Sequence, residues 1–303
     1  MYNYDGLYEL LKQRNLNKSD LVDLLHISSR TIAKISKDEP LSPFVIKKLT
    51  NFFSCEESDI YIIVTDNPLL QQLKDEKNHR ISGGFYHELQ IRMTYNSNHI
   101  EGSTLSEEQT RRIFETSTLD GSDGLPVDDI IETVNHFRAI DYCIDIAEEP
   151  LTEEIIKKLH YLVKRGTKDE TLSWFQVGEY KSRPNVVGGM ETSSPEDVAS
   201  DMKALLAAYH KKKKISLEEI IDFHFRFEGI HPFQEGNGRV GRLIAFKECL
   251  HHKLVPFIIE DRKKYFYYRG LREYLTDPGY LIGTCYDGQD TVRGMLELFD
   301  MKN

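Results

Sequence analysis

Twelve consecutive residues in the last third of the chain gather side chains that can act together on an anion. The stretch reads His231-Pro232-Phe233-Gln234-Glu235-Gly236-Asn237-Gly238-Arg239-Val240-Gly241-Arg242. Two glycines flank Asn237 just before an apolar-periodic run from Leu243, which predicts a tight loop that enters a helix. Backbone amides at a helix N-terminus point outward without partners, and the helix dipole adds positive potential. This place therefore favours an anionic group.

The charged residues of this stretch suit phosphate chemistry. Arg239 and Arg242 lie three apart on the expected helix and can converge on one anion. The carboxylate of Glu235 beside such a cradle suits Mg²⁺ that bridges protein and phosphates. His231 is the nearby group with a pKa suited to taking a proton at neutral pH. Each feature alone is typical of an ordinary turn or a solvated surface, but together they indicate phosphoryl or nucleotidyl transfer.

The composition sets the class of protein that carries this stretch. The 303 residues include 39 basic and 49 acidic side chains, a net charge of −10 and 40% hydrophobic residues. These values are ordinary for globular proteins and exclude collagen-like, mucin-like and disordered classes. No window approaches 18 apolar residues, so no membrane span is expected, and the first residues lack the shape of a secretory signal. The four cysteines show no CxxC spacing and are expected to be free thiols in the cytoplasm.

Helical spacing of apolar residues along most of the chain predicts an all-α fold. Beyond residue 84 the expected helices are Phe85–Ile100, Glu107–Thr116, Asp128–Ile146, Thr152–Gly166, Asp197–His210, Leu217–Gly229, Gly238–His251 and Lys263–Leu275. One stretch differs, because Gly178–Gly189 combines Val186 and Val187 with a proline and paired glycines, which predicts a short β-hairpin. Residues 65–84, interrupted by Pro68 and Gly83-Gly84, are expected to be a linker.

The first 64 residues are expected to form a separate small helical domain. Between residues 12 and 48 there are eight Lys or Arg and four Asp or Glu, a local charge of +4 in an acidic chain. A helix, a short turn and a second helix with small polar residues at its start follow the helix-turn-helix pattern. Residues 21–35 resemble the Cro/C1-type helix-turn-helix family, although His26-Ile27 stands where that family often has a turn glycine. The resemblance implies DNA contacts by Ser29, Arg30, Thr31 and Lys34; a protein-docking module is the alternative.

The stretch at residues 231–242 resembles the Fic domain motif, HxFx(D/E)GNGRxxR, at all of its specified positions. The resemblance extends from about Phe85 to the C-terminus, so the domains are expected at 1–64 and 85–303, joined by the linker. It implies an all-α Fic core with a small β-hairpin flap. It also implies a protein adenylyltransferase, which transfers AMP from ATP to a Ser, Thr or Tyr hydroxyl of a target protein. The enzyme itself is a further candidate target.

The resemblance also implies roles for individual residues. His231 would deprotonate the target hydroxyl, Glu235 would hold Mg²⁺, and Phe233 would anchor the loop in the core. The flap would lie over the nucleotide, and Tyr267-Tyr268 would border the adenine, with Leu275 where the family often has asparagine. The nucleotide-binding residues so implied are Asn185, Val186, Val187, Gly188, Glu235, Gly236, Asn237, Gly238, Arg239, Val240, Gly241, Arg242, Tyr267 and Tyr268.

A second motif lies at the end of the helix expected at Phe85–Ile100. A glutamate at a helix C-terminus opposes the dipole, which suggests that Glu101 has a cationic partner. Ser97-Asn98-His99-Ile100-Glu101-Gly102 resembles the inhibitory [S/T]xxxE[G/N] helix of Fic proteins. By this resemblance Ser97 and Glu101 are inhibitory residues, and Glu101 pairs with Arg242 and denies the ATP γ-phosphate its site.

Two other functions remain open for the same chain. One is removal of AMP from proteins, with Glu101 orienting a water molecule. The other is a DNA-binding regulator whose Fic core senses nucleotide without transferring it. The identity of the target, the presence of a homo-oligomer and any DNA operator are not determined by the sequence.

Overall fold

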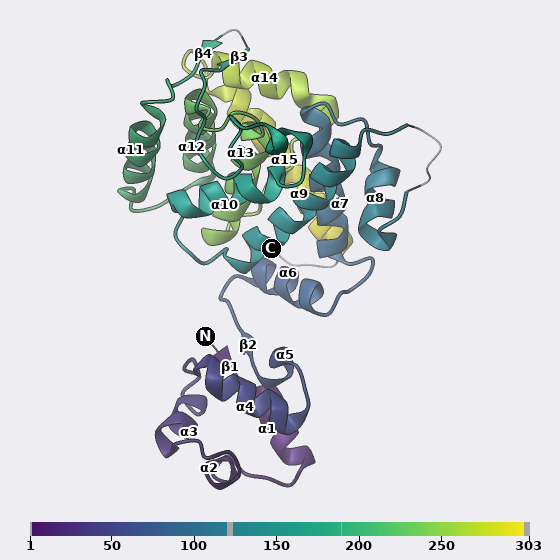
Figure 1. Cartoon of the computed structure of the whole chain (residues 1–303), viewed down its shortest axis with the longest axis vertical. Coiled ribbons are helices and arrows are strands. Elements are labelled where there is room, and N and C mark those ends of the chain that lie inside the picture. Colours follow the sequence, from purple (N-terminus) through teal and green to yellow (C-terminus); the bar gives the residue numbers. More distant parts are fainter. Residues whose placement is uncertain (1, 120–123, 189, 300–303) are drawn as a thin grey trace. The chain divides into compact units, whose positions relative to one another are not determined.

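The computed structural model describes residues 2–119, 124–188 and 190–299, and its chain divides into two compact units, residues 1–71 and 72–303 (Figure 1). The all-α prediction is confirmed, because the only strands in the described residues are four two-residue segments. Within the same residues, no helix combines the length and the apolar character needed to cross a membrane.

The first unit is a small helical domain with its own core. Its elements are β1 (Tyr2–Asn3), α1 (Asp5–Gln13), α2 (Asp20–Leu25), α3 (Ser29–Ile35), α4 (Pro43–Phe53), α5 (Glu57–Ile60) and β2 (Ile62–Ile63). Ser28 caps α3 by accepting the N–H of Thr31, and Ser42 caps α4, which starts with a proline. Strand β1 pairs antiparallel with β2, so the two ends of this unit are joined. The apolar faces of the helices bury Leu7, Leu21, Ile35 and Leu49 completely.

The segment predicted as a linker contains a helix instead. Helix α6 spans Pro68–Asn78 and buries Leu70 and Leu73 fully, and the boundary between the two units falls inside it. The side chain of Asn67 accepts the N–H of Leu70 at 3.2 Å and so caps the first turn.

The second unit is a bundle of helices around one central helix. Its elements are α7 (Phe85–Ile100), α8 (Glu107–Thr116), α9 (Val127–Asp145), α10 (Glu153–Lys164), η1 (Lys168–Thr171), β3 (Val186–Val187), β4 (Met190–Glu191), α11 (Val198–His210), α12 (Leu217–Ile230), α13 (Asn237–His251), η2 (Asp261–Lys263), α14 (Lys264–Glu273) and α15 (Gly279–Leu298). Helix α13 packs against α7, α9, α10 and α12, and nearly all its residues are buried. The bundle therefore surrounds α13, whose N-terminus the sequence marks as the candidate site (Figure 1).

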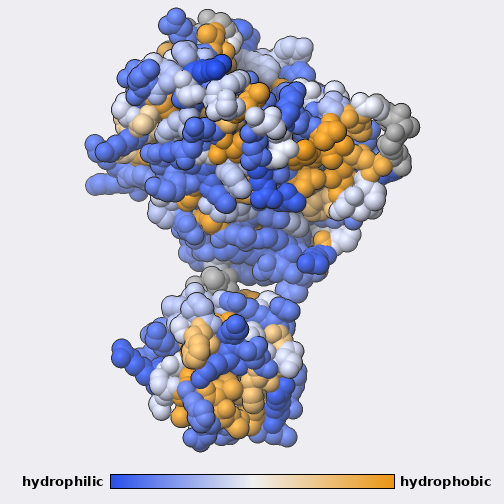
Figure 2. Space-filling view, viewed as in Figure 1, coloured by the Kyte–Doolittle hydropathy of each residue, from blue (hydrophilic) through white to orange (hydrophobic). Residues whose placement is uncertain are grey.

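Two features of the bundle differ from the sequence expectation or add to it. The hairpin is shorter than predicted, because only Val186–Val187 and Met190–Glu191 pair, and the last predicted residue, Gly189, lies outside the described residues. Apart from the main core, Leu105, Ile113 and Phe137 form a small apolar cluster over α8 and α9, and Figure 2 shows apolar side chains gathered on that face.

Candidate active site

The loop between α12 and α13 is held by its own side chains. His231 at its start and Gly236 at its end have positive φ angles of 51° and 80°, and these turn the chain sharply from one helix into the next. The side chain of Asn237 accepts the N–H of Phe233 at 2.8 Å and donates to the carbonyl of Phe233 at 2.7 Å. The loop is thus preorganised, with the first amides of α13 facing outward.

Phe233 anchors this loop, as the resemblance implied. Its ring is fully buried and stacks on His160 of α10 with centroids 4.0 Å apart. His160 accepts the N–H of Gly178 at Nδ1, so its Nε2 donates to the carbonyl of Glu235 at 3.1 Å. Burial lowers the pKa of His160 to about 3, which keeps the ring in this neutral form. No motif or spacing in the sequence pointed to His160.

His231 lies at the C-terminal end of α12 with its side chain 15% exposed. Its Nδ1 faces the carbonyl oxygen of Glu228 at 3.3 Å, so Nδ1 donates there and Nε2 is the basic nitrogen. Burial lowers the pKa of His231 to about 4. The ring is therefore neutral at pH 7 and can accept a proton.

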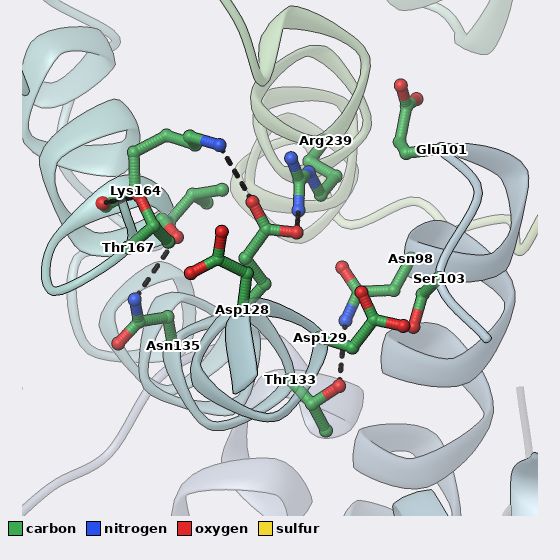
Figure 3. A network of polar contacts seen from close by, with 12 residues as sticks. Asn98, Glu101, Ser103, Asp128, Asp129, Thr133, Asn135, Lys164, Thr167 and Arg239 are labelled. Atoms are coloured by element: carbon green, nitrogen blue, oxygen red, sulfur yellow. Dashed lines mark hydrogen bonds and ion pairs between the residues drawn. The ribbon is translucent and has the colours of Figure 1, made fainter. Parts of the chain in front are cut away.

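Arg239 points from the first turn of α13 toward a carboxylate that the sequence analysis did not single out. Its Nη1 lies 2.5 Å from Glu132 of α9, whose other oxygen binds Lys164 of α10 at 2.8 Å. Figure 3 shows Lys164 and Arg239 reaching this carboxylate from two helices. Burial would raise the pKa of Glu132, but Arg239 and Lys164 lower it on balance, so the group is ionised. Glu132 thus fixes the direction of Arg239.

Arg242 and the predicted inhibitory residues meet beside the same turn of α13. Arg242 is 5% exposed; its Nη2 binds Glu101 at 2.7 Å and the Ser97 carbonyl at 2.9 Å, and its Nε donates to the Ser97 hydroxyl at 3.0 Å. Burial alone would raise the pKa of Glu101, but the two arginines lower it, so the carboxylate is charged. A Cβ at Gly238 would lie 2.2 Å from Glu101 Oε1, so the carboxylate sits directly against the helix entrance.

The flap is tied to the loop by a lysine that the sequence analysis missed. Lys181 donates its backbone N–H to Pro232 at 2.8 Å, and its Nζ donates to Asn185 at 2.6 Å. Asn185 in turn donates to the carbonyl of Phe233 at 3.0 Å. Val186 is 63% exposed. Asn185, at the base of the predicted flap, is therefore hydrogen-bonded to the loop, whereas Val186 in the hairpin is exposed to solvent.

The tyrosine pair behind α13 has two different environments. Tyr267 is fully buried, with its hydroxyl 2.7 Å from His224 Nε2, whereas Tyr268 is 42% exposed and donates to the carbonyl of Ile100 at 2.8 Å. Tyr268 is thus free to border a ligand on one side. Leu275 is 87% exposed and lies beyond the end of α14. Val240 is buried in the core, so only its backbone can take part in the site.

Glu235 is the exposed carboxylate at the loop, and the described residues contain no group of three acidic, histidine or cysteine side chains that could hold a metal alone. A single carboxylate together with nucleotide phosphates is a usual set of ligands for Mg²⁺. The donor set at Glu235 fits that ion only together with a nucleotide.

Comparison with known proteins agrees with this geometry. The model of the Fic/DOC family matches residues 150–248, which include the whole loop and most of α13. Residues 150–248 therefore form a Fic domain. The Cro/C1-type HTH DNA-binding domain model matches residues 7–66, so the first unit is a Cro/C1-type helix-turn-helix domain.

Relatives and solved structures resemble the Fic domain and its flanking helices. The chain is 27% identical over 184 residues to protein adenylyltransferase Fic of Nematostella vectensis and 30% identical over 181 residues to that of Drosophila persimilis. These matches cover 59% and 57% of this chain but only 42% and 34% of the relatives. A Fic-domain-containing signaling protein of Bacteroides thetaiotaomicron is 26% identical with a TM-score of 0.62, over 76% of this chain and 91% of that one. Fic-1 of C. elegans, at 18% identity and a TM-score of 0.60 over 90% of this chain and 78% of that one, shares the fold.

Proposed function

We propose that this chain is a protein adenylyltransferase that moves AMP from ATP to a Ser, Thr or Tyr hydroxyl of a target protein and is held inactive by Glu101. The observation that carries the proposal is the convergence, at the N-terminus of one buried helix, of a neutral His231, outward backbone amides and two arginines. The names of the relatives support it. Free cysteines, three of them buried, support a reducing compartment such as the cytoplasm.

The transfer follows from the placement of these groups. Nε2 of His231 takes the proton of the target hydroxyl, whose oxygen forms a bond to the α-phosphorus of ATP. The bond from that phosphorus to the bridging oxygen breaks, and pyrophosphate leaves with the electron pair. The amides around Gly236, Asn237 and Gly238, with Arg239, stabilise the charge on the phosphates. Glu235 would hold Mg²⁺, which supplies charge neutralisation at the phosphates when bound.

The proposal is tested by looking for AMP that is covalently attached to a protein. The Glu101→Gly protein is incubated with ATP labelled in the α-phosphate and Mg²⁺, alone and in cell lysate, and intact mass is measured. AMP attached to this chain or to a lysate protein supports transfer. Absence of any adduct, with ATP binding retained, would instead favour a core that only senses nucleotide.

Two substitutions, one in the loop and one in the first turn of α13, are expected to separate phosphate binding from metal binding. Arg239→Ala should raise KM for ATP, because its guanidinium, aimed by Glu132, is then missing from the cradle. Glu235→Ala should abolish the Mg²⁺-dependent turnover. Rates are measured against ATP and Mg²⁺ concentrations, with Glu196→Ala, an exposed residue after the flap, as the control. A Glu235→Ala protein with unchanged Mg²⁺ dependence would place the metal elsewhere.

We also propose that the N-terminal domain binds DNA only as an oligomer. Ser29 and Arg30 are exposed at the start of α3, Thr31 and Lys34 are half-buried, and His26 adopts the positive φ of 51° that the turn needs. A local charge of +4 supplies few phosphate contacts, each adding about one unit to the salt dependence. Two copies on one operator would double them.

Gel shifts with the full chain at two salt concentrations test this proposal. We expect binding that weakens with salt and is lost in Arg30→Ala, but not in Arg272→Ala, which changes an exposed arginine of α14. Salt-insensitive or absent binding would favour a protein-docking module.

A further inference from the structure

Glu228 is a buried carboxyl group next to the proposed base, and the Fic motif does not include it. It lies on the last turn of α12, three residues before His231, and its side chain is 11% exposed. Its Oε2 is 3.7 Å from Nδ1 of His231. Its Oε1 is buried without a hydrogen-bond partner among the described residues. A buried polar atom without a hydrogen-bond partner destabilises the fold, so its position beside the histidine needs an explanation.

The packing around Glu228 makes room for this carboxyl. A Cβ at Gly241 would lie 2.6 Å from Oε1, so the glycine of α13 leaves the space that the carboxyl occupies. On the helix of Glu228, the ring of His224 would lie 2.8 Å from the same Cβ, and its Nε2 is hydrogen-bonded to the hydroxyl of Tyr267 of α14. Gly241 and His224 therefore lie near Oε1 of the carboxyl, and His231 lies near its other oxygen.

We propose that Glu228 is a positioning residue for the general base: its backbone carbonyl accepts the Nδ1–H of His231, and its carboxylate, 3.7 Å from Nδ1, stabilises the imidazolium formed when Nε2 takes the target's hydroxyl proton. The inference rests on the proposed AMP transfer. The proton moves from the hydroxyl to Nε2, the oxygen bonds to the α-phosphorus, and pyrophosphate leaves with the electron pair. The positive charge left on the ring is then offset by Glu228, and Nδ1 keeps its proton. Contacts of this kind are often long in the free enzyme and tighten in the reacting complex.

The charges around the pair make this contact sensitive to pH and to Glu101. Burial raises the pKa of Glu228 to about 8; Glu101 acts in the same direction, and Arg242 of α13 opposes it. Burial also lowers the pKa of His231, and Lys181 acts in that direction too. At pH 7, with Glu101 in place, both groups are thus neutral and His231 is a weak base. Above that pH Glu228 ionises and strengthens the base, and loss of Glu101 moves this ionisation to lower pH.

The kinetic test uses the Glu101→Gly chain over a pH range from about 6 to 9.5. Glu228→Gln keeps the shape of the side chain and removes the charge, so kcat should fall about tenfold at the alkaline end, KM for ATP should change less than about twofold, and the rise with pH should disappear. Glu228→Asp should keep the rise. Glu218→Gln changes a half-buried glutamate in the first turn of the same helix, which accepts a hydrogen bond from Tyr286, and should behave like the parent. An unchanged pH profile in Glu228→Gln would overturn the inference.

A second measurement needs no activity. Ring carbon resonances of His231 are followed by NMR in the otherwise unaltered chain and assigned with a His231 variant. Ionisation of the neighbouring carboxyl should give an inflection near pH 8 that is absent in Glu228→Gln. No inflection in the parent chain would overturn the contact even if Glu228→Gln did not fold. An inflection without AMP transfer at any pH would show that the proposed function, and not the contact, is wrong.

Discussion

Replacing His231 is expected to lower the rate of AMP transfer by about 10²–10⁴-fold while leaving ATP binding nearly intact. The reason is that in the proposed mechanism Nε2 acts on the target hydroxyl, whereas the amides and arginines of α13 hold the phosphates. Alanine removes the base, but it adopts the positive φ of 51° at this position less readily than histidine does. Asparagine enters that region more readily, so His231→Asn removes the base with less strain.

Both variants are made in the Glu101→Gly chain, which lacks the proposed inhibitory carboxylate, and auto-modification and ATP affinity are measured. His79→Ala, which changes an exposed histidine after α6, is the matched control and should retain the parent rate. A His231→Asn protein that folds, binds ATP and transfers AMP at the parent rate would show that His231 is not the base.

Replacing Glu101 by glycine is expected to raise auto-modification at least tenfold, which corresponds to about 1.4 kcal/mol in the barrier. In the proposed function Glu101 and a γ-phosphate compete for the guanidinium of Arg242, whose Nη1 is buried without a partner among the described residues and faces Gly238. An exposed ion pair contributes only ~0–1 kcal/mol, but this arginine is 5% exposed, so its partner matters more. Without Glu101 the triphosphate can settle with its α-phosphorus in line with the hydroxyl.

Two companion variants separate this explanation from general loosening of α7. Arg242→Ala should not activate, because the same arginine is missing from the productive complex. Ser97→Ala removes only the hydroxyl that accepts the Nε–H of Arg242 and keeps the hydrogen bond to the backbone carbonyl of residue 97. Its increase in the rate of auto-modification should therefore be smaller than that of Glu101→Gly. Equal rates for the parent and Glu101→Gly would show that Glu101 does not inhibit transfer. Activation by Arg242→Ala would show that Glu101 inhibits through a group other than Arg242.

Local features of the fold were predictable because short-range rules govern them. The hydrophobic spacing of the helices, the Ser28 cap and the turn glycines each depend on neighbouring residues along the chain. Helix α15 received no predicted range, since Gly283, Gly288 and Gly294 weaken its intrinsic propensity. It forms because it packs on α12 and α14, and Gly288 allows its backbone to approach Ile258. Helix α6 was not predicted either, because the spacing of apolar residues in its segment is only weakly helical.

The residues of the site also fall into those that local sequence predicts and those that only packing brings together. Its loop and the two arginines are contiguous, so their spacing alone indicated phosphate chemistry. The Glu101–Arg242 pair was implied by the resemblance of a second short motif to the inhibitory helix of Fic proteins. Glu132, His160, Lys181 and Glu228 carry no signal in the sequence, because each depends on a neighbour brought close by packing. The contact of Glu132 with Arg239 spans 107 residues of sequence, and that of His160 with Glu235 spans 75. The sequence by itself determined which functional groups lie at the N-terminus of α13, because those residues are neighbours along the chain. The orientation and the ionisation state of those groups depend on the surrounding helices, because packing supplies their partners and removes water.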